Sequence, residues 1–525
     1  MSPVTWRGES LCGRRVDGFT AKDAAESNLR LVTGVLEAGG IDYFLVPGKN
    51  RTGHCVGVAR GDRDRFLALV AERHGSGPLL VGVPKGGGRM TQISFASGRI
   101  PRSDVLRFCE LRLGARGQVL GGYELGCDVE FWRDGSELVG EGGNSFLKRL
   151  RIQDGEEVLR GALVAPRHNR VADMLPQDMR KPAWAEVGAR QIPTFEVFTA
   201  TTPEDVTFPI DVVYTWVDGQ EPALREKRAR YLPEEKRDVA PWEFGESRYT
   251  SHDELKYSLR SLEMYAPFVR NVYIVTDGQT PSWLDTSQDR VRVVDHREIF
   301  PEDALPVFNS HAIETRLHHI PGLSEHYLYL NDDVFFGRPV TPQHFFHGNG
   351  IIKVPVSPFK ISLGSGAPGA TAPNAAGGNV RALLHRSRGS FVTQRFLHTP
   401  HPQRKSVLSE IEREFSADFA RTTRSRFRSA SDIAPVSMAH HYAMITGRGV
   451  SGKYRYRYLD IAGEKAEGQF RELERDRSYD LFCVNDVDSD NRQRRRMREF
   501  LEGYFPFAAS WEGAHRFGQR SDLAA

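Results

Sequence analysis

The chain between residues 210 and 337 repeats one pattern, in which a short apolar run ends in an acidic residue. The runs are IDVVYTWVDG, NVYIVTDG, VRVVDH and HYLYLNDD. Uninterrupted aliphatic and aromatic runs of this length are typical of strands buried on both faces, as in a parallel sheet. Between the first two runs, a helical stripe stops before a proline and consists of Leu255, Leu259, Leu262 and Ala266. Ser251 and Glu254 have the S-x-x-E spacing of a capping box, which predicts the start of this helix.

This order of strands and helices predicts an α/β catalytic domain with a Rossmann-like, mostly parallel sheet. The carboxyl ends of parallel strands meet at one edge of a sheet, and ligands bind there. The acidic strand ends are Asp218, Asp277, Asp295 and the Asn331-Asp332-Asp333 tripeptide. Carboxylates gathered at such an edge suit a divalent cation, Mg²⁺ or Mn²⁺, that holds a diphosphate. Asp332, Asp333 and the more distant Asp486 are the predicted metal ligands, and a solvated Asn-Asp-Asp turn is the alternative.

The first 170 residues have a different organisation. Residues 21–40 have helical periodicity that ends at Gly39-Gly40, and IDYFLVPG follows as a predicted strand. Asp128 and Glu130 on a later predicted strand resemble a nucleotidyltransferase-like fold, although PGKNRTG stands where such enzymes have a Gly-Ser element. We therefore predict an α+β accessory domain over residues 1–170. The proline-rich residues 171–208 predict a linker, so that the catalytic domain spans residues 209–515.

Composition limits the classes of function. Lysine and arginine together number 71, aspartate and glutamate 68, and the formal net charge is +3. This balance argues against bulk nucleic-acid binding. The five cysteines form no CxxC pair and predict neither a zinc site nor a disulfide framework. The N-terminus lacks an apolar signal core, and no stretch approaches the ~20 apolar residues of a spanning helix. We expect a cytoplasmic protein, and basic patches leave peripheral contact with the inner face of the cell membrane open.

Three histidines and two arginines are candidates for acid–base and phosphate chemistry. His311 opens a predicted helix, and His398 and His401 flank a proline. Histidine is the usual group for removing a proton from a hydroxyl near neutral pH. Arg248 and Arg428 suit bidentate binding of phosphate. For each of these residues the alternative is a helix cap or a solvated surface position. The absence of P-loop, GxSxG and HExxH motifs argues against common NTPases, serine hydrolases and zincins.

From about residue 209 to 512 the chain resembles the Stealth family. The resemblance rests on four blocks in order: IDVVYTWVDG; SRYTSHDELKYSLRSLEMYAPFVRNVYIVTDGQTPSWL through FNSHAIE to YLYLNDDVFFG; HTPH with RSASD; and CVNDVD with FLEGYFPF. That family includes bacterial capsular polysaccharide phosphotransferases and the α/β subunit of GlcNAc-1-phosphotransferase. The resemblance implies transfer of a hexose 1-phosphate from a nucleotide sugar, often UDP-linked, to a hydroxyl of an acceptor glycan. The implied partners are a nucleotide-sugar donor and a glycan acceptor, with no nucleic acid.

The resemblance also implies roles for single residues. Metal binding falls to Asp332, Asp333 and Asp486, and donor binding to Asp211, Trp216, Asp218, Asn331 and Asn485. The implied catalytic set is Arg248, Asp253, His311, His398, His401 and Arg428. Within it the two arginines neutralise phosphoryl charge, and His398, His401 or a strand-end carboxylate is the base. His311 is less favoured, because the eukaryotic relative has proline there. A metal-dependent glycosyltransferase with the same donor and a catalytically inactive carbohydrate-binding regulator are the alternatives.

Overall fold

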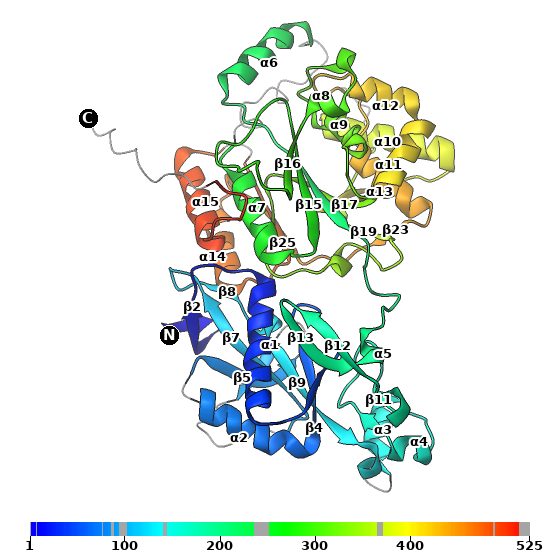
Figure 1. Cartoon of the computed structure of the whole chain (residues 1–525). Coiled ribbons are helices and arrows are strands. Elements are labelled where there is room, and N and C mark those ends of the chain that lie inside the picture. The colour runs from blue at the N-terminus through cyan, green and yellow to red at the C-terminus, as the bar shows by residue number, and fades with distance from the viewer. Residues whose placement is uncertain are drawn as a thin grey trace, which may run out of the picture. The chain divides into compact units, whose positions relative to one another are not determined.

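The computed structural model describes residues 2–6, 8–75, 77–85, 89–93, 102–139, 144–235, 251–364, 371–486 and 489–513. The chain divides into two compact units (Figure 1). The first comprises Met1–Pro203 with the short segments Arg338–Thr341 and Glu474–Asp476, and the second comprises the remainder. The first unit therefore extends beyond the predicted boundary at residue 170.

The first unit is built on an 11-stranded mixed sheet, in which β1-β2-β7-β9-β10-β11 form the main path. Helices α1 and α2 cover one face, where Leu36, Phe66 and Val129 share a core (Figure 1). The predicted helix over residues 21–40 is confirmed as α1 and ends before Gly39. The mixture of helices and strands agrees with an α+β unit, whereas its accessory role stays a prediction. The bounds are β1 (Ser2–Trp6), β2 (Glu9–Arg15), α1 (Ala21–Ala38), β3 (Tyr43–Leu45), β4 (Cys55–Ala59), α2 (Arg63–His74), β5 (Leu79–Lys85), β6 (Arg89–Ile93), β7 (Val105–Leu113), β8 (Val119–Gly121), β9 (Cys127–Asp134), α3 (Asn144–Leu150), α4 (Glu156–Arg160), β10 (Leu163–Val164) and β11 (Met174–Leu175).

Asp128 and Glu130 of β9 are both buried and both paired with arginine. Arg107 donates to Asp128 through Nε at 2.6 Å and through a terminal nitrogen at 3.0 Å. Arg167 lies between the two acids and donates to each at 2.7 Å. Two guanidinium groups thus neutralise the carboxylates that resembled a nucleotidyltransferase pair, which makes them an ion-pair network that supports the fold.

The segment predicted as a linker, residues 171–208, instead contains a β-hairpin. Strands β12 (Pro182–Val187) and β13 (Arg190–Phe195) pair antiparallel, Gly188 takes a positive φ of 60° in the turn, and α5 (Glu196–Thr199) follows. Prolines misled the prediction, because in a two-stranded sheet each strand is an edge and can lack an inward N–H. Pro182 begins β12, and Pro193 lies within β13 opposite Trp184.

The second unit is organised by a five-stranded sheet of order β16-β15-β14-β17-β22. The pairs β14–β15, β14–β17 and β15–β16 are parallel, and β22 joins β17 antiparallel at one edge. The predicted mostly parallel sheet is therefore present, within a unit whose smaller sheets are mixed. The bounds are β14 (Ile210–Thr215), α6 (Pro222–Glu235), α7 (Glu254–Tyr265), β15 (Val269–Thr276), β16 (Val291–Asp295), α8 (His296–Ile299), α9 (Ser310–Glu314), β17 (His326–Asn331), β18 (Val334–Phe336), β19 (Ile352–Val354), β20 (Val356–Lys360), α10 (Ala372–Arg388), β21 (Gln394–Phe396), β22 (His401–Arg404), α11 (Lys405–Glu414), α12 (Ser416–Thr423), α13 (Pro435–Ile445), β23 (Gly449–Ser451), β24 (Tyr456–Asp460), α14 (Ala466–Asp476), β25 (Leu481–Asn485) and α15 (Asn491–Tyr504).

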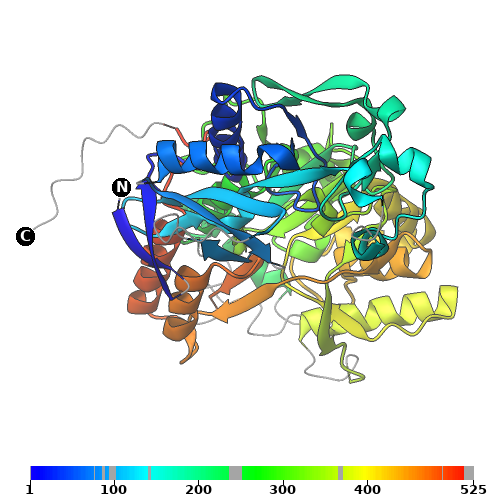
Figure 2. The same ribbon diagram turned by 90° about the horizontal axis from the view of Figure 1, so that it is seen from below.

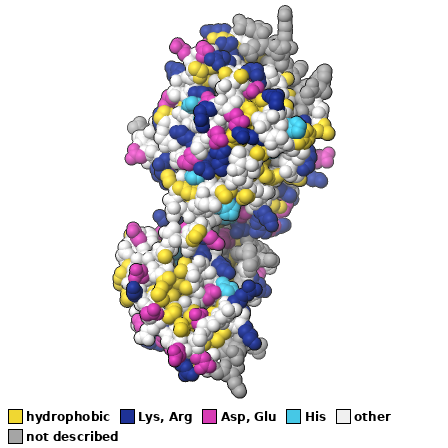
Figure 3. Space-filling model, turned by 90° about the vertical axis from the view of Figure 1, so that its right-hand side faces the viewer, with side chains coloured by type: hydrophobic (Ala, Val, Ile, Leu, Met, Phe, Trp, Pro, Cys, Tyr) yellow, Lys and Arg dark blue, Asp and Glu magenta, His cyan; other side chains and the backbone are white. Residues whose placement is uncertain are grey.

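Helices cover both faces of this sheet (Figure 1). Val213 of β14 points into a core formed with α9–α13, while the next residue, Tyr214, points to the other face and bonds Ser258 of α7 at 2.8 Å. The predicted stripe of α7 is buried, with Leu255 and Leu259 both fully covered. On its exterior, this unit intermixes cationic and anionic side chains (Figure 3).

The predicted capping box at Ser251 is not formed. Helix α7 begins at Glu254, and its N-cap, Asp253, has a left-handed φ of 68° without a side-chain cap. The Glu254 carboxylate accepts instead from the backbone N–H of His252 at 2.6 Å. His252 Nε2 in turn lies 3.2 Å from Asp486 Oδ2, a long-range contact that local spacing does not encode.

Candidate active site

The candidate site lies at the carboxyl ends of β14 and β17, where the parallel register places Thr215 beside Asn331. The Tyr329 hydroxyl lies 3.1 Å from Thr215 Oγ1 and donates to Asn331 Oδ1 at 3.3 Å. Asp332 and Asp333 follow immediately. Trp216 and Asp218 follow β14 at the same edge, half-buried. The expectation that acid-ended strands are parallel neighbours is confirmed for β14, β15, β16 and β17.

Three carboxyl groups share a desolvated space at this edge. Burial raises the pKa of Asp332 well above its usual range, and the nearby charges of Glu254 and Asp333 raise it further. Burial likewise raises the pKa of Asp333 and of Glu254. Asp333 Oδ2 accepts from Cys483 Sγ at 3.2 Å, whereas its Oδ1 is buried without a partner among the described residues. Carboxylate oxygens are the ligands that Mg²⁺ prefers, and buried carboxyls that raise one another's pKa favour a nearby positive charge.

A second, three-stranded sheet brings the last block of the chain to this place. Strand β18 leaves Asp333 and pairs antiparallel with β25, so that Val334 lies opposite Cys483. The backbone N–H of Val484 also donates to the Asp333 carbonyl at 3.0 Å. Asn485 ends β25 and bonds the side chain of Tyr458. Residues about 150 positions apart are thereby fixed beside one another by backbone hydrogen bonds.

Asp486 differs from the other two predicted metal ligands because its oxygens already have partners. Its Oδ1 accepts from the backbone N–H of Ser489 at 3.0 Å. Its Oδ2 lies 3.2 Å from His252 Nε2 and 3.3 Å from Arg494 Nε. Burial opposes ionisation, but these bonds lower the pKa of Asp486 to about 2. The geometry therefore places Asp486 in an ion-pair network beside the carboxyl cluster.

The two histidines of the HTPH segment are in different environments. His398 is exposed, its charge lowers the pKa of Asp333, and its ring lies 5.8 Å from that of Tyr458. His401 has its Nδ1 3.0 Å from Nε2 of the fully buried His440. Burial, and then the charge of His398, lower the pKa of His401 to about 3. His398 is therefore the histidine that solvent and a substrate hydroxyl can reach.

A third group joins residues of the second and third blocks. Asp432 is fully buried and accepts from Asn309 Nδ2 and from the Ser429 backbone N–H, both at 2.9 Å. His311 Nδ1 lies 3.9 Å from Asp432 Oδ2, and Arg428 donates to Ser310 Oγ at 2.6 Å. Burial raises the pKa of Glu314, which the charges of His311 and Arg428 partly offset.

Electrostatic coupling links this group to the carboxyl edge through Tyr329. Burial raises the pKa of Tyr329, and the charges of Glu314 and Asp332 raise it further, while Arg428 lowers it. The charges of Arg428 and Asp332 therefore both act on the Tyr329 hydroxyl. Figure 1 shows α9, which carries Ser310 and His311, above the end of the central strands.

Three predicted site residues lie elsewhere or outside the described residues. Asp211 is near the amino end of β14, fully buried, and accepts from Arg270 Nε at 2.9 Å and from the Ser324 N–H at 2.7 Å. Its place argues against the predicted role in donor binding, because its oxygens are used at the opposite end of the strand. Asp253 is exposed. Arg248 lies outside the described residues.

Sequence reasoning did not propose three residues that the structure brings into the site. These are His252, Glu254 as a member of the carboxyl cluster, and Cys483. Glu254 was assigned to a helix cap by its spacing from Ser251. His252 and Cys483 carry no local signal, because their partners Asp486 and Asp333 are far away in the sequence.

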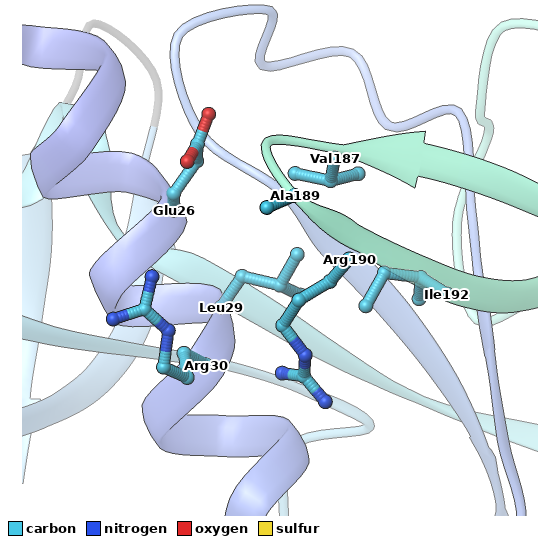
Figure 4. Close-up of a pocket in the computed structure, with 7 residues that line it drawn as sticks. All are labelled: Glu26, Leu29, Arg30, Val187, Ala189, Arg190 and Ile192. Atoms are coloured by element: carbon cyan, nitrogen blue, oxygen red, sulfur yellow. The ribbon is translucent and has the colours of Figure 1, made fainter.

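Two other places in the chain have features of a binding site: a His-His-Glu cluster and a cavity in the first unit. His318, His319 and Glu412 bring three ligand atoms within 4.8 Å, a set that could hold a metal ion. Arg316 pairs with Glu412 at 2.7 Å, and the Nε2 atoms of His318 and His319 lie 2.6 and 2.9 Å from Glu412 Oε2, so both oxygens of this carboxylate already have partners. In the first unit, a cavity of about 260 Å³ lies between α1 and the β12–β13 hairpin (Figure 4). Leu29 and Ile192 line it, and Arg190 at its rim is held by Glu37 at 2.7 Å.

Comparison with family models and curated proteins decides the family. The models for Stealth conserved regions 1, 2, 3 and 4 match residues 208–236, 248–354, 397–445 and 471–522. Exopolysaccharide phosphotransferase SCO6023 of Streptomyces coelicolor is 40% identical over 513 residues, covering 94% of this chain and 83% of that protein. The chain belongs to the Stealth family. Exopolysaccharide phosphotransferase CpsY of Mycobacterium tuberculosis is 34% identical over 541 residues, covering 99% of this chain and 94% of that protein.

The four Stealth regions coincide with the parts of the chain that build the candidate site. Region 2 holds Asp332 and Asp333, region 3 holds His398 and Arg428, and region 4 holds Asp486. Among solved structures, galactosyltransferase LgtC is similar at 13% identity with a TM-score of 0.28, over 56% of this chain and 95% of LgtC. Mouse xyloside xylosyltransferase 1 has 9% identity and a TM-score of 0.25, over 53% of this chain and 98% of that one.

Proposed function

We propose that this Stealth chain transfers a hexose 1-phosphate from a nucleotide sugar, UDP-linked in the first instance, to a hydroxyl of an acceptor glycan. The product is a phosphodiester in an exopolysaccharide or capsule. Relatives that match nearly the whole chain are named exopolysaccharide phosphotransferases, which supports the reaction class. The observation that carries the proposal is the cluster of Asp332, Asp333 and Glu254 beside the exposed His398.

A divalent cation, Mg²⁺ or Mn²⁺, fits this cluster. Asp332 and Asp333 would hold it, since Asp333 Oδ1 has no described partner and the three carboxyls repel one another in a desolvated space. When bound, the ion would supply positive charge to the donor diphosphate. Asp486 is proposed as a support for the cluster, because its oxygens are taken by His252, Arg494 and Ser489.

Side chains of the protein are proposed to carry out the proton transfer and to stabilise the charge of the reaction. The acceptor hydroxyl oxygen attacks the phosphorus next to the sugar, the bond from that phosphorus to the nucleotide oxygen breaks, and nucleoside monophosphate leaves. His398 takes the hydroxyl proton, because it is exposed and its charge acts on Asp333. Arg428, positioned by Ser310, opposes the negative charge on the phosphoryl oxygens. Trp216, Asp218, Asn331 and Asn485 are proposed to surround the donor at the same sheet edge.

The experiment that tests this is product analysis with purified protein, a divalent ion and a panel of nucleotide sugars. Phosphodiester signals in ³¹P NMR together with UMP release support the proposal. A glycoside with UDP release would show a glycosyltransferase instead. Absence of turnover across donors and ions, with binding retained, would point to a regulator.

Among the described residues, no helix combines the length and the apolar character that a membrane crossing needs. We propose that the reaction takes place on the cytoplasmic side, where nucleotide sugars are found.

A further inference from the structure

One part of the chain has a strong charge asymmetry. Between Asp333 and Glu410 the sequence contains no acidic residue over 76 positions, residues 334–409, and contains nine lysines and arginines. The whole chain carries a net charge of only +3. The stretch builds β20, α10 and β21, and part of its charge is offset in the fold, because Arg388 pairs with Glu414 and Arg404 with Glu325.

The same stretch exposes three large apolar side chains. Phe359 is 72% exposed, Leu363 80% and Phe391 54%. Phe359 belongs to β20, which pairs antiparallel with β21, and the Ile361 N–H extends this pairing by donating to the Thr393 carbonyl at 2.8 Å. We call Phe359, Leu363 and Phe391 the ribbon patch.

Arg381 of α10 contacts the segment that follows β20 and the segment that precedes β21. Its terminal nitrogens donate to the Ile361 carbonyl at 3.2 Å and to the Ser362 carbonyl at 2.8 Å. Its guanidinium also lies 5.1 Å from the centre of the Phe391 ring. Leu363 and Phe391 therefore lie near each other, on segments that the Arg381 side chain contacts. Figure 2 shows β20 and α10 side by side along the lower edge of the molecule in that view.

Two cations of the same stretch are exposed and available to a partner. Lys360 follows Phe359 directly, and Arg386 lies in the last turn of α10; both are exposed, and neither forms an ion pair with a described residue. Arg388 differs, because it pairs with Glu414 and bonds the Tyr442 hydroxyl. Three exposed apolar side chains and two exposed cations thus lie in a stretch that has no acidic residue. This combination fits the headgroup region of an anionic bilayer.

We propose that the ribbon patch, with Lys360 and Arg386, docks the protein on an anionic lipid surface. Phe359, Leu363 and Phe391 enter the interface, and the two cations face the lipid phosphates. Docking would hold the candidate site close to the membrane, because β21 leads to His398 two residues later. Phe396 at the end of β21 also packs against His440 and His441, with ring centres 4.8 and 4.7 Å apart.

The test is co-sedimentation of the purified full chain with vesicles of phosphatidylcholine mixed with phosphatidylglycerol, and with phosphatidylcholine alone. The parent chain should bind the mixed vesicles and lose most binding when salt is raised. K360Q/R386Q should weaken binding about 25-fold, from about fivefold for each cation. F359S/L363S should weaken it about tenfold or more, because both side chains lose their place in the apolar region.

Matched controls separate this surface from others. Trp184→Ser removes a side chain of similar exposure, 64%, from the first unit, and R495Q/R498Q removes two exposed cations from α15. Both controls should bind as the parent does, and circular dichroism should show every variant folded. Equal binding to neutral vesicles, unchanged binding of the patch variants, or an equal loss in R495Q/R498Q would each overturn the proposal. So would absent vesicle binding with patch variants that change self-association, which would indicate a protein contact. The readout is physical binding, so it does not depend on the proposed reaction.

Discussion

The assignment of Asp211 to the fold and not to donor binding can be tested by its removal. The Asp211 side chain is fully buried, and four donors reach its carboxylate. Arg270 donates through Nε at 2.9 Å and a terminal nitrogen at 2.6 Å, and the backbone N–H groups of Asn271 and Ser324 donate at 3.2 and 2.7 Å. Asp211→Ala removes every one of these acceptors at once.

The expected cost in free energy of unfolding is about 3 kcal/mol. Breaking a buried ion pair by removing one partner costs roughly 3–5 kcal/mol. The lower end applies here, because the Arg270 side chain is 43% exposed and regains water, while the backbone N–H groups of Asn271 and Ser324 lose their acceptor. Arg270→Ala should cost less, because those N–H groups still satisfy the carboxylate. The double variant should fall short of the sum by about 0.5–3 kcal/mol, as expected for residues in contact.

Urea unfolding of the parent and the three variants measures these values, and transfer activity is measured below the unfolding transition. We expect activity per folded molecule, and KM for the nucleotide sugar, to stay within about twofold of the parent, since mutations away from the chemistry act through folding. An Asp211→Ala protein as stable as the parent, with transfer lost or KM for the donor raised, would refute the structural role and restore the predicted donor role.

Further predictions concern the site itself. Asp333→Asn should abolish metal-dependent transfer and weaken Mn²⁺ binding measured by calorimetry with the fold intact; full activity would contradict the metal assignment. His398→Gln should lower kcat about 10²–10⁴-fold, whereas His401→Gln should act mainly on stability, and the reverse order would show that His401 is the base. Acid should destabilise the fold, because burial lowers the pKa of His401 to about 3 and of His441 to about 4. Between these values and the usual 6.5 the unfolded chain binds more protons. Stability is thus complete above pH 6.5 and falls as the pH drops towards 4, with a smaller slope in His441→Gln, as melts at several pH values can check.

The sequence predicted those parts of the second unit that follow from short-range pattern. The apolar stripe of α7 and the acid-ended strands of the parallel sheet are encoded in spacings of a few residues, and both are present. The start of α7 was not predictable in this way, since Ser251 and Glu254 have capping spacing but His252 is held by Asp486. The His252–Asp486 contact spans more than 200 positions, so a local capping preference worth about 1 kcal/mol carries no information about it.

The prediction of a linker over the proline-rich residues 171–208 failed for a different reason. Proline is informative about a central strand, but the β12–β13 hairpin has no central strand. The alternation of Ala183, Trp184 and Ala185 was the signal that could have indicated a strand pair, together with Gly188 at the turn. Composition alone could not separate an edge hairpin from a linker.

The pairing of β18 with β25 shows which neighbours of the predicted metal ligands a pattern-based search could not find. Acidic residues at a strand end can be found from a single run, so Asp332 and Asp333 were identified. Which carboxyl joins them depends on sheet pairing: β25 brings Cys483 to Asp333 and turns Asp486 towards His252, while α7 brings Glu254 to Asp332. The ion-paired Asp486 has a lowered pKa, and the clustered Glu254 a raised one. The opposite shifts have opposite causes, since Asp486 accepts hydrogen bonds from His252 and Ser489 whereas Glu254 is desolvated beside Asp333.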